Sequence, residues 1–401
     1  MEITLGAQQR EAADKILDWY RDGDSPSFVL AGYAGTGKTT LSKYLAEEIG
    51  SNVQFCAFTG KAVNILREKG CRNVSTIHTL LYKPVGHDKT KLHDLQEQLK
   101  LANEGGFGFT IDALKRDIAV MTKEMRKPKF ELNTETNGGS ILFVDEYSML
   151  PNDIVQDLMR KYKKILFMGD PFQLPPVKGN CNLEPNFFLT EIHRQAMESA
   201  IVRLSCDIRE NQSFSYGDFG DLVYMPAFEA RPEIYMEVDQ IIVGRNSTRS
   251  AINQWYRGQK GISSLLPVKG DKMICLKNNK KLGLFNGMIC TATDDAIKAK
   301  DYYNNFMLKT DIELPAGEET LQVWEGDVMG KPDDYDWNDW SMKSLNRFDY
   351  ANAITCHKSQ GSEFKSCLVY NEPVGNDDLM KRRWLYTAIT RGKEKVWLVQ
   401  P

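Results

Sequence analysis

The chain has 401 residues, more than one hydrophobic core usually holds, so two or more domains are expected. Its composition, 42% hydrophobic and 26% charged, is typical of an ordinary globular protein. The formal net charge of −3 excludes a global positive field that would attract nucleic acid, so any binding of phosphates must come from a local groove.

The cysteines and the N-terminal segment indicate the setting of the chain. Eight scattered cysteines without a C-x-x-C pair, and only five histidines, predict reduced thiols, no zinc site and a cytoplasmic location. The opening residues, MEITLGAQQREAADKILDWY, contain acidic side chains and no apolar h-region, so a signal peptide is not expected. No apolar run approaches the ~20 residues that span a bilayer, so no membrane partner is expected.

The first motif is a glycine-rich loop between a strand and a helix. Residues 27–30 have the apolar pattern of a short buried strand, and G-x-x-x-x-G-K-T follows at 32–39. This is the context of a P-loop, because loop amides and a helix N-terminus together bind phosphate. Lys38 is expected to reach the β- and γ-phosphates of ATP, and the Thr39 hydroxyl to bind Mg²⁺. The nucleotide-binding residues expected in this segment are Gly35, Thr36, Gly37, Lys38, Thr39 and Thr40.

Two later strands also end in polar residues. The strand at 141–144 is followed by Asp145, expected to hold Mg²⁺, and by Glu146, expected to orient and deprotonate the attacking water. The strand at 165–168 leads to Gln173, whose amide can sense the γ-phosphate or the water. Because parallel α/β sheets bind ligands at the carboxyl ends of their strands, these side chains should meet the P-loop.

Ten motifs in order carry a resemblance to superfamily 1 helicases, most closely to the RecD-like and phage Dda-like branch. One of them alone, such as STIHTLL, would mean little, but ten in the correct order are highly specific. The resemblance implies two RecA-like lobes with ATP between them, single-stranded DNA across both, and 5′→3′ movement. The motifs are LGAQQREAA, AGYAGTGKTT, AFTGKAVNIL, STIHTLL, VDEYSM, GDPFQLPPV, LTEIHRQ, IIVGRNSTRSAIN, ITCHKSQGSEF and YTAITRG.

The resemblance assigns roles to two arginines. Arg391, in YTAITRG, resembles an arginine finger that the second lobe supplies to the γ-phosphate held by Lys38, and Arg194, in EIHRQ, resembles a second one. Such fingers stabilise transition-state charge and are worth ~10³–10⁵ in rate, so hydrolysis would require a closed cleft. For an isolated T-R-G the alternative is a surface arginine that caps a turn.

Three further nucleotide contacts follow from the resemblance. Gln9 lies where the family has its adenine-reading glutamine, whose amide can pair with the N6/N7 edge of adenine. The neighbouring Gln8 leaves this assignment open by one residue. Gly361 and Glu363, in ITCHKSQGSEF, are expected on the nucleotide side of the second lobe.

Short polar side chains in the motifs suit sequence-independent contacts with a DNA backbone. His78 by itself is equally well explained as a structural histidine. The predicted DNA-binding residues are Thr59, Lys61, Thr76 and His78 in the first lobe, and Asn246, Thr248, Thr355, His357 and Ser359 in the second.

Two stretches exceed a minimal RecA fold. For residues 82–139 the resemblance implies a subdomain with a pin that splits the duplex, and Phe107 and Phe109 are the wedge candidates. The alternative is a mobile loop whose rings pack back on the protein, because glycine-rich loops make poor wedges. Residues 261–346 have the pattern of short strands with an Asn-Gly turn, and the resemblance suggests an SH3-like β-barrel.

The expected fold is therefore α/β, with two RecA-like P-loop lobes of parallel sheets flanked by helices. The first lobe comprises residues 1–81 and 140–191, and the second comprises 192–260 and 347–401. Each lobe is interrupted by one of the two small subdomains.

The expected function is that of a monomeric DNA helicase that depends on ATP and Mg²⁺ and moves 5′→3′. Its expected partners are single-stranded DNA and single-strand/duplex junctions, with single-strand-binding and replication proteins as further candidates. One alternative is a translocase that uses the same motor to strip proteins from the strand, or acts on RNA. The other is a single-lobe P-loop NTPase or kinase, against which Arg194, Arg391 and CHKSQGSEF argue.

Overall fold

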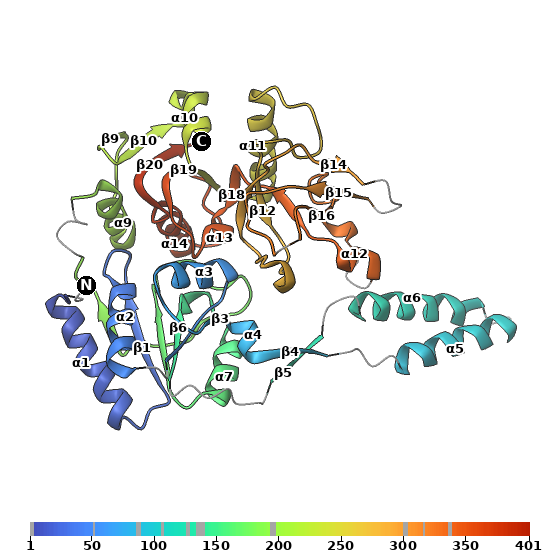
Figure 1. Ribbon diagram of the computed structural model, residues 1–401, viewed down its shortest axis with the longest axis horizontal. Coiled ribbons are helices and arrows are strands. Elements are labelled where there is room, and N and C mark those ends of the chain that lie inside the picture. Colours follow the sequence, from blue (N-terminus) through green and yellow to red (C-terminus); the bar gives the residue numbers. More distant parts are fainter. Residues whose placement is uncertain are drawn as a thin grey trace.

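The computed structural model describes ten segments of the chain, and they form two α/β lobes that face each other, with an arm that projects from the first lobe (Figure 1). Among the described residues, no helix combines the length and the apolar character that crossing a bilayer requires. The segments are 4–50, 53–85, 90–105, 108–125, 129–133, 141–192, 198–299, 304–315, 317–335 and 339–401.

The first lobe is built on a six-stranded parallel sheet in the order β3-β2-β6-β7-β1-β8. Its central strands are continuous apolar runs, as expected of strands that helices cover on both faces. The three strands predicted from the sequence are present, each one or two residues longer than predicted. The strands are β1 Ser27–Gly32, β2 Val53–Ala57, β3 Val74–Thr76, β6 Ile141–Asp145, β7 Ile165–Gly169 and β8 Phe187–Leu189.

Helices flank this sheet and begin where the sequence provides a start signal. The helix α3 begins after Thr59, whose side-chain oxygen accepts a hydrogen bond from Ala62 N. The helices are α1 Ala7–Asp22, α2 Lys38–Ile49, α3 Gly60–Glu68, α4 Ile77–Leu81 and α7 Asn152–Lys161, with the 3₁₀ turn η1 Tyr147–Met149.

The second lobe repeats this plan with the order β18-β11-β19-β20-β10-β9, and only the short edge strand β9 is antiparallel. Its largest core side chains, Trp384 and Tyr386, come from one helix, α14. The strands are β9 Gly217–Asp218, β10 Leu222–Pro226, β11 Gln240–Val243, β18 Ala353–Thr355, β19 Phe364–Tyr370 and β20 Gly392–Gln400. The helices are α9 Ala200–Glu210, α10 Pro232–Glu237, α11 Asn246–Gln259, α13 Cys356–Ser359 and α14 Asp378–Ile389, with the turn η2 Ala227–Glu229.

The first insertion forms the projecting arm (Figure 1). An antiparallel pair, β4 Tyr82–Val85 and β5 Lys129–Leu132, leads to the helices α5 Thr90–Gly105 and α6 Gly108–Met125, which pack against each other. Of the two wedge candidates, Phe107 lies outside the described residues, and only the backbone of Phe109, in the first turn of α6, is described. The wedge stays a prediction.

The second insertion is built on two three-stranded antiparallel sheets that share one hydrophobic core, and one of them is completed by β17, which begins two residues beyond the predicted boundary at 346. The core includes Met273, Phe306, Val323 and Phe348, which come from strands of both sheets. These short strands agree with the predicted β-rich module, whereas an SH3-like barrel stays a prediction. The elements are β12 Lys272–Cys275, β13 Ile289–Thr291 and β17 Phe348–Tyr350; β14 Ile297–Lys298, β15 Asn305–Leu308 and β16 Leu321–Trp324; α12 Trp340–Ser344; and the turns η3 Lys280–Leu282 and η4 Pro332–Asp334.

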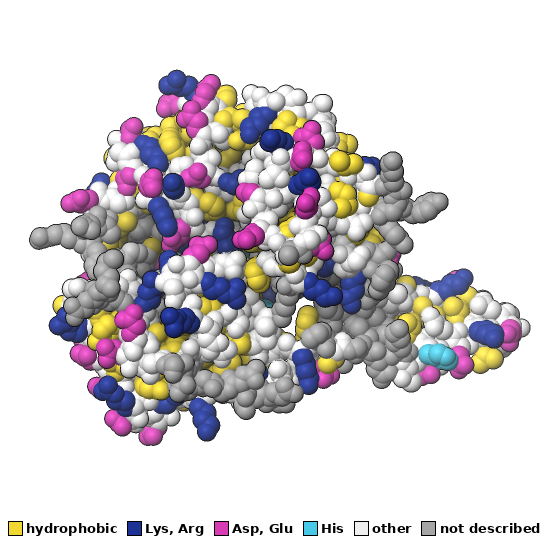
Figure 2. Space-filling model, viewed as in Figure 1, with side chains coloured by type: hydrophobic (Ala, Val, Ile, Leu, Met, Phe, Trp, Pro, Cys, Tyr) yellow, Lys and Arg dark blue, Asp and Glu magenta, His cyan; other side chains and the backbone are white. Residues whose placement is uncertain are grey.

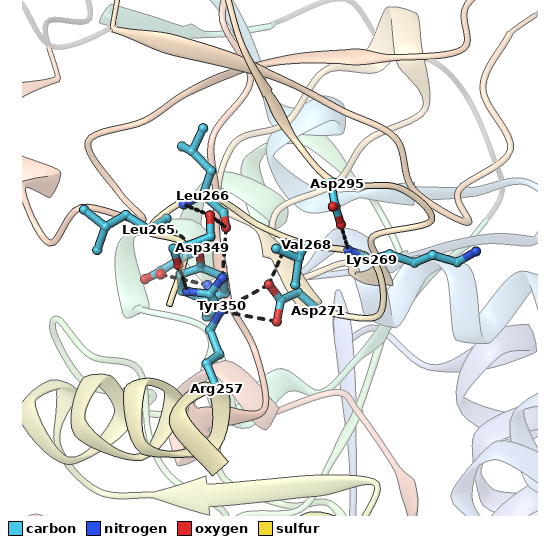
Figure 3. Close-up of polar contacts among 10 residues, drawn as sticks. Arg257, Leu265, Leu266, Val268, Lys269, Asp271, Asp295, Asp349 and Tyr350 are labelled. Atoms are coloured by element: carbon cyan, nitrogen blue, oxygen red, sulfur yellow. Dashed lines mark hydrogen bonds and ion pairs between the residues drawn. The ribbon is translucent and has the colours of Figure 1, made fainter. Parts of the chain in front are cut away.

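A buried ion pair joins this insertion to the second lobe (Figure 3). Arg257, at the end of α11, places Nε 3.1 Å from Asp271 Oδ2, and its Nη1 and Nη2 donate to the carbonyls of Ser264 and Leu266. Its guanidinium also lies 4.3 Å from the centre of the Tyr350 ring. Because every guanidinium nitrogen has an acceptor, the charge is buried without an unpaired donor.

Candidate active site and nucleic-acid interface

A cavity of about 400 Å³ lies between the two lobes at the carboxyl ends of β1, β6 and β7. Its walls come from both lobes, so segments more than 300 residues apart in the chain face the same space. The first lobe contributes Gly35, Gly37, Lys38, Thr39, Thr40, Asp145, Glu146 and Gln173, and the second contributes Gly361, Glu363, Thr390 and Arg391. Of the twenty described residues that line the cavity, eleven are predicted site residues, and the other nine, which include Thr390, are not.

The P-loop has the backbone that its glycines predict. Gly35 and Gly37 have φ angles of 80° and 76°, in the left-handed region that favours glycine. Lys38 Nζ donates to the carbonyls of Gly32 and Tyr33, at 2.7 and 2.9 Å. Thr36 is buried beneath the loop, where its hydroxyl donates to Tyr33 O, so its side chain does not line the cavity.

Gln8 and Gln9, in the first helix, both form hydrogen bonds that hold neighbouring segments in place. Gln9 is buried, and its Nε2 donates to Thr36 O at 3.1 Å while its Oε1 accepts from Gly6 N. Gln8 joins α1 to the segment after β8, accepting from the amides of Thr190 and Glu191. Gln9 thus supports the P-loop from outside the cavity, and its contact with adenine stays a prediction.

The acid pair lies on the cavity wall in the predicted position. Glu146 N donates to Asp145 Oδ1, and Glu146 has a φ of 54°, which is unusual for a residue other than glycine. Burial raises the pKa of Asp145. Burial, followed by the charge of Asp145, raises the pKa of Glu146 to about 7, against the opposing effect of Arg391 and Lys38. Glu146 Oε2 is buried without a hydrogen-bond partner among the described residues. A strained, incompletely bonded carboxyl group of this kind is typical of a functional site.

Gln173 lies beside this pair, on the loop that follows β7. Its backbone N–H donates to Asp170 O, and its side-chain Oε1 is another buried oxygen without a partner in the described part of the chain. The residues that line the cavity therefore include two with a buried oxygen acceptor that has no partner among the described residues.

Arg391 faces these groups from the second lobe. The side chain is buried, and its nitrogens are bonded within its own lobe: Nε to Thr387 O, Nη1 to Ser362 O and Nη2 to the Thr390 hydroxyl, at 3.0–3.2 Å. The guanidinium is therefore held in position from behind. Arg391 is therefore not a surface residue, and it lines the cavity that Lys38 also lines, but its bonds to Thr387 and Thr390 do cap the last turn of α14. Its role as an arginine finger stays a prediction.

The other predicted second-lobe residues are also at this cavity. Gly361, with a φ of 67°, approaches the first lobe so closely that a Cβ would lie 3.2 Å from Ala62 Cβ. Burial by itself would raise the pKa of Glu363, but the hydrogen bond from Lys393 and the charge of Lys69 outweigh it and lower that pKa. The second predicted arginine, Arg194, lies outside the described residues and stays a prediction.

Thr39 and Asp145 form a donor set that fits Mg²⁺. Both line the same cavity, and a hydroxyl and a carboxylate are the hard oxygen ligands that this ion prefers when phosphates complete its coordination. The charge of Lys38 acts on Asp145 and favours its carboxylate form.

The predicted DNA side has one cationic contact between the lobes. Lys61 Nζ lies 4.8 Å from the centre of the Phe364 ring of the second lobe, on which Lys272 also lies, at 6.0 Å. Burial, then the charges of Lys272 and Arg391, lowers the pKa of Lys61 to about 8. Lys and Arg side chains lie along the boundary between the lobes on the face shown in Figure 2.

The remaining first-lobe candidates lie at the starts of helices. The Thr59 and Thr76 hydroxyls each accept a backbone N–H of their helix, α3 and α4. His78 packs against Phe58 and Tyr82, with ring centres 5.4 and 5.8 Å away, and burial lowers its pKa. His78 is nevertheless exposed, so both readings of it remain open and its DNA contact stays a prediction.

The second-lobe candidates divide into exposed and buried side chains. Asn246 is exposed at the start of α11, and His357 is half-buried. Thr248 donates to Glu372 Oε1. Thr355 is buried at the start of α13, and Ser359 is fully buried, where its hydroxyl donates to Cys356 O. The structure therefore does not bring the Ser359 side chain to a DNA-binding surface, because Ser359 lies on the buried side of α13.

Three residues without a predicted role make contacts between separate parts of the chain near the cavity. Tyr386 and Asp170, both inside predicted motifs, are hydrogen-bonded to each other across the lobes. Phe285, on the second insertion, packs on Gly60 of the first lobe, where any Cβ would lie 2.4 Å from Phe285 Cβ. A glycine at the start of α3 was the only signal for this contact.

Family models match both lobes. A model described as an AAA domain matches residues 4–218, and one described as a UvrD-like helicase C-terminal domain matches 350–399. The ATP-dependent RecD2 DNA helicase of Deinococcus radiodurans is 25% identical over 394 residues, covering 92% of this chain and 46% of that protein. An uncharacterised protein, R530, of Acanthamoeba polyphaga mimivirus is 29% identical over 196 residues, covering 43% of this chain and 34% of that protein. The chain thus spans less than half the length of these curated relatives.

The fold is similar to that of solved Pif1 helicases. A Pif1 helicase from Bacteroides, solved in complex with ADP-AlF3 and single-stranded DNA, superposes with a TM-score of 0.53 at 17% identity, over 99% of this chain and 92% of the other. Pif1 from Candida albicans gives a TM-score of 0.51 at 17% identity, over 99% and 94%. At these identities the likeness establishes a shared fold.

Proposed function

The chain belongs to the AAA domain family and, through both lobes, to the superfamily 1 helicases, and from this premise we propose that it is an ATP-dependent DNA helicase. It moves 5′→3′ along single-stranded DNA as a monomer, and it unwinds duplex at junctions. The DNA substrate agrees with the RecD2 DNA helicase and with the Pif1 helicase solved with single-stranded DNA, and the direction follows from the resemblance of the motifs.

The observation that carries this proposal is the position of Arg391 in the same cavity as the P-loop. Neither lobe alone supplies both a phosphate-binding loop and the opposing guanidinium. Hydrolysis then depends on how the two lobes meet, which is the coupling that a motor needs and a single-lobe kinase lacks.

In this mechanism the chain's own groups divide the chemistry. The P-loop amides and Lys38 bind the phosphates, and Arg391 stabilises the charge that develops during phosphoryl transfer. Glu146 accepts a proton from the attacking water, which Gln173 helps to orient. Bound Mg²⁺, held by Thr39 and Asp145, would neutralise phosphate charge.

Strand binding is proposed for the boundary between the lobes. Lys61 provides a cation there, and the starts of α3 and α4 present polar groups suited to backbone contacts. Closing and opening of the cleft would change the spacing of the two lobes along a bound strand. Alternate grip and release would then move the strand in one direction.

An unwinding assay tests this proposal directly. A fluorescent duplex with a 5′ single-stranded tail should be separated in the presence of ATP and Mg²⁺, and the same duplex with a 3′ tail should not. Lys38→Ala should be inactive on both. Separation only of the 3′-tailed duplex would contradict the direction, and ATP turnover stimulated by single strands without separation of either duplex would favour the protein-stripping translocase.

A second assay tests whether the substrate is DNA or RNA. Stimulation of ATP hydrolysis by single-stranded DNA should exceed stimulation by RNA of the same sequence. Equal or greater stimulation by RNA would overturn the assignment of DNA as the substrate.

A further inference from the structure

Tyr386 belongs to the second lobe, but its hydroxyl group is bonded entirely to the first. The residue is fully buried in α14, and the hydroxyl donates to Asp170 Oδ2 at 2.5 Å and accepts from Ala34 N at 3.0 Å. Its ring meets that of Phe172 edge-on, with centres 5.2 Å apart. One side chain therefore connects α14 to the P-loop and to the loop after β7.

The contact with Ala34 involves the nucleotide cavity itself. Ala34 is a P-loop residue that lines the cavity, and its N–H is held by Tyr386. Any rearrangement of this part of the loop must therefore move, or break with, the tyrosine hydroxyl. Burial, then the charge of Asp170, raises the pKa of Tyr386 well above its usual value, so the hydroxyl stays a protonated donor.

The other end of the connection is Arg391. Its Nε donates to the carbonyl of Thr387, the residue after Tyr386, at 3.0 Å. The Thr390 hydroxyl, which accepts from Arg391 Nη2, donates to Tyr386 O at 2.8 Å. The Arg391 guanidinium is thus bonded to the same helical turn that carries Tyr386. A displacement of this turn would therefore also displace the guanidinium.

A second pair of bonds holds the same turn against the loop after β7. Leu174 N donates to the Thr387 hydroxyl at 2.9 Å, and Gln360 Nε2 donates to Leu174 O at 3.0 Å. The segment 170–174, which contains Gln173, is therefore bonded to the second lobe at both of its ends.

We infer that Tyr386 is a positioning residue that ties the P-loop to the turn carrying Arg391, so that the guanidinium is correctly placed only when the loop holds the tyrosine hydroxyl. This inference rests on the proposed ATP hydrolysis. A merely structural tyrosine would hold the lobes together without acting through the arginine, and this difference can be measured.

The test is a mutant cycle measured as ATP turnover at saturating single-stranded DNA. Tyr386→Phe keeps the ring and removes the hydroxyl. It should lower kcat about 10- to 100-fold, the range for loss of a hydrogen bond to a charged group, with the Kd of a fluorescent ADP analogue within about threefold of wild type. In an Arg391→Ala background the same change should alter the residual kcat less than about twofold, because the group through which it acts is already absent.

Two further variants keep the test decisive. Tyr162→Phe is the control, because it removes a buried tyrosine hydroxyl that lies in the first lobe and donates to Gln54 Oε1 away from the cavity. This variant should keep the wild-type kcat. Asp170→Asn keeps the shape of the acceptor without its charge, and it should lower kcat about tenfold with an unchanged nucleotide Kd. If Tyr386→Phe does not fold, Asp170→Asn with and without Arg391 decides the question.

An equal loss of kcat in both backgrounds, or a folded Tyr386→Phe protein with wild-type kcat, would overturn the inference. A different result would contradict the proposed function itself. In that case the wild-type protein would not hydrolyse ATP, or Lys38→Ala would hydrolyse ATP as fast as wild type.

Discussion

Two groups of buried polar side chains in the described part of the chain are bonded in opposite ways. At the junction of the second insertion, Arg257 and Asp271 have acceptors and donors for each of their charged atoms (Figure 3). In the cavity between the lobes, Glu146 and Gln173 each keep a buried oxygen without a partner among the described residues, and Glu146 has a positive φ.

This difference distinguishes an ion pair that stabilises the fold from side chains that are proposed to act on a nucleotide. A buried polar atom without a partner destabilises a fold by about 1–3 kcal/mol, and chains keep few of them. Arg257 and Asp271 do not bear this cost. Glu146 and Gln173 bear it in the cavity where activation of a water is proposed, while Arg391, which lines the same cavity, is bonded through all three of its side-chain nitrogens.

The largest effect is expected at Lys38. Lys38→Ala removes the cation that the P-loop directs at the phosphates, so ATP turnover should fall to background. Binding of single-stranded DNA, measured by fluorescence anisotropy, should remain. Retained turnover in this variant would show that the glycine loop is not the site of hydrolysis.

The second-largest loss of ATP turnover is expected for Arg391→Ala. It should keep nucleotide affinity within a few-fold and slow single-turnover hydrolysis by about 10³ or more, because the arginine acts on transition-state charge. Arg391→Lys should restore little, since an ammonium cannot reproduce the planar set of donors that holds the group to Thr387, Ser362 and Thr390. Hydrolysis at the wild-type rate in either variant would remove the finger role.

Glu146→Gln tests the acceptor side. The amide keeps the size of the side chain but cannot take a proton, so kcat should fall by about 10² or more with little change in ATP affinity. Because the amide also lacks a charge in a buried position, the melting temperature should stay the same or rise. A variant that loses stability but keeps kcat would place Glu146 with the structural group instead.

A substitution in the ion pair between Arg257 and Asp271 should have the opposite effect: it should lower stability and leave ATP turnover unchanged. Arg257→Met leaves Asp271 buried without its partner, which should lower the free energy of unfolding by about 3–5 kcal/mol, measured in urea. The kcat of the folded variant at low temperature should stay within about twofold of wild type. Loss of turnover without loss of stability would mean that the contrast between the two groups is mistaken.

The smallest effect is expected at Lys61. Lys61→Met should weaken binding of single-stranded DNA a few-fold and reduce the slope of log affinity against log salt by about 1. Because burial, Lys272 and Arg391 lower the pKa of Lys61 to about 8, the wild-type lysine loses its charge as pH rises through that value. Wild-type affinity should therefore decline above about pH 8 more than that of Lys61→Met; parallel pH profiles would exclude Lys61 as a DNA contact.

Local motifs made one part of the site predictable. The P-loop and the acid pair are each fixed by a strand, a turn and a helix that are adjacent in the chain, so residue types at set spacings identify them. The same reasoning found the strands that carry them. Arg391 needed more, because an arginine in a short turn acquires its meaning only from a partner in the other lobe.

Other features depend on packing that the sequence does not encode locally. Nothing near Ser359 in the chain indicates that it lies on the buried side of α13, and nothing near Tyr386 indicates that Asp170 and Ala34 are its partners. Gln9 shows a related limit: an amide placed to read a base can equally well bond the P-loop carbonyl that lies closer to it.

The most direct test of a nucleotide shared between two lobes is a crystal structure with ADP, aluminium fluoride, Mg²⁺ and single-stranded DNA. The expected result is one nucleotide in the cavity, with Lys38 and Arg391 both within hydrogen-bonding distance, about 3 Å, of the fluoride group. A nucleotide bound by the P-loop while the Arg391 guanidinium points elsewhere would contradict the shared site.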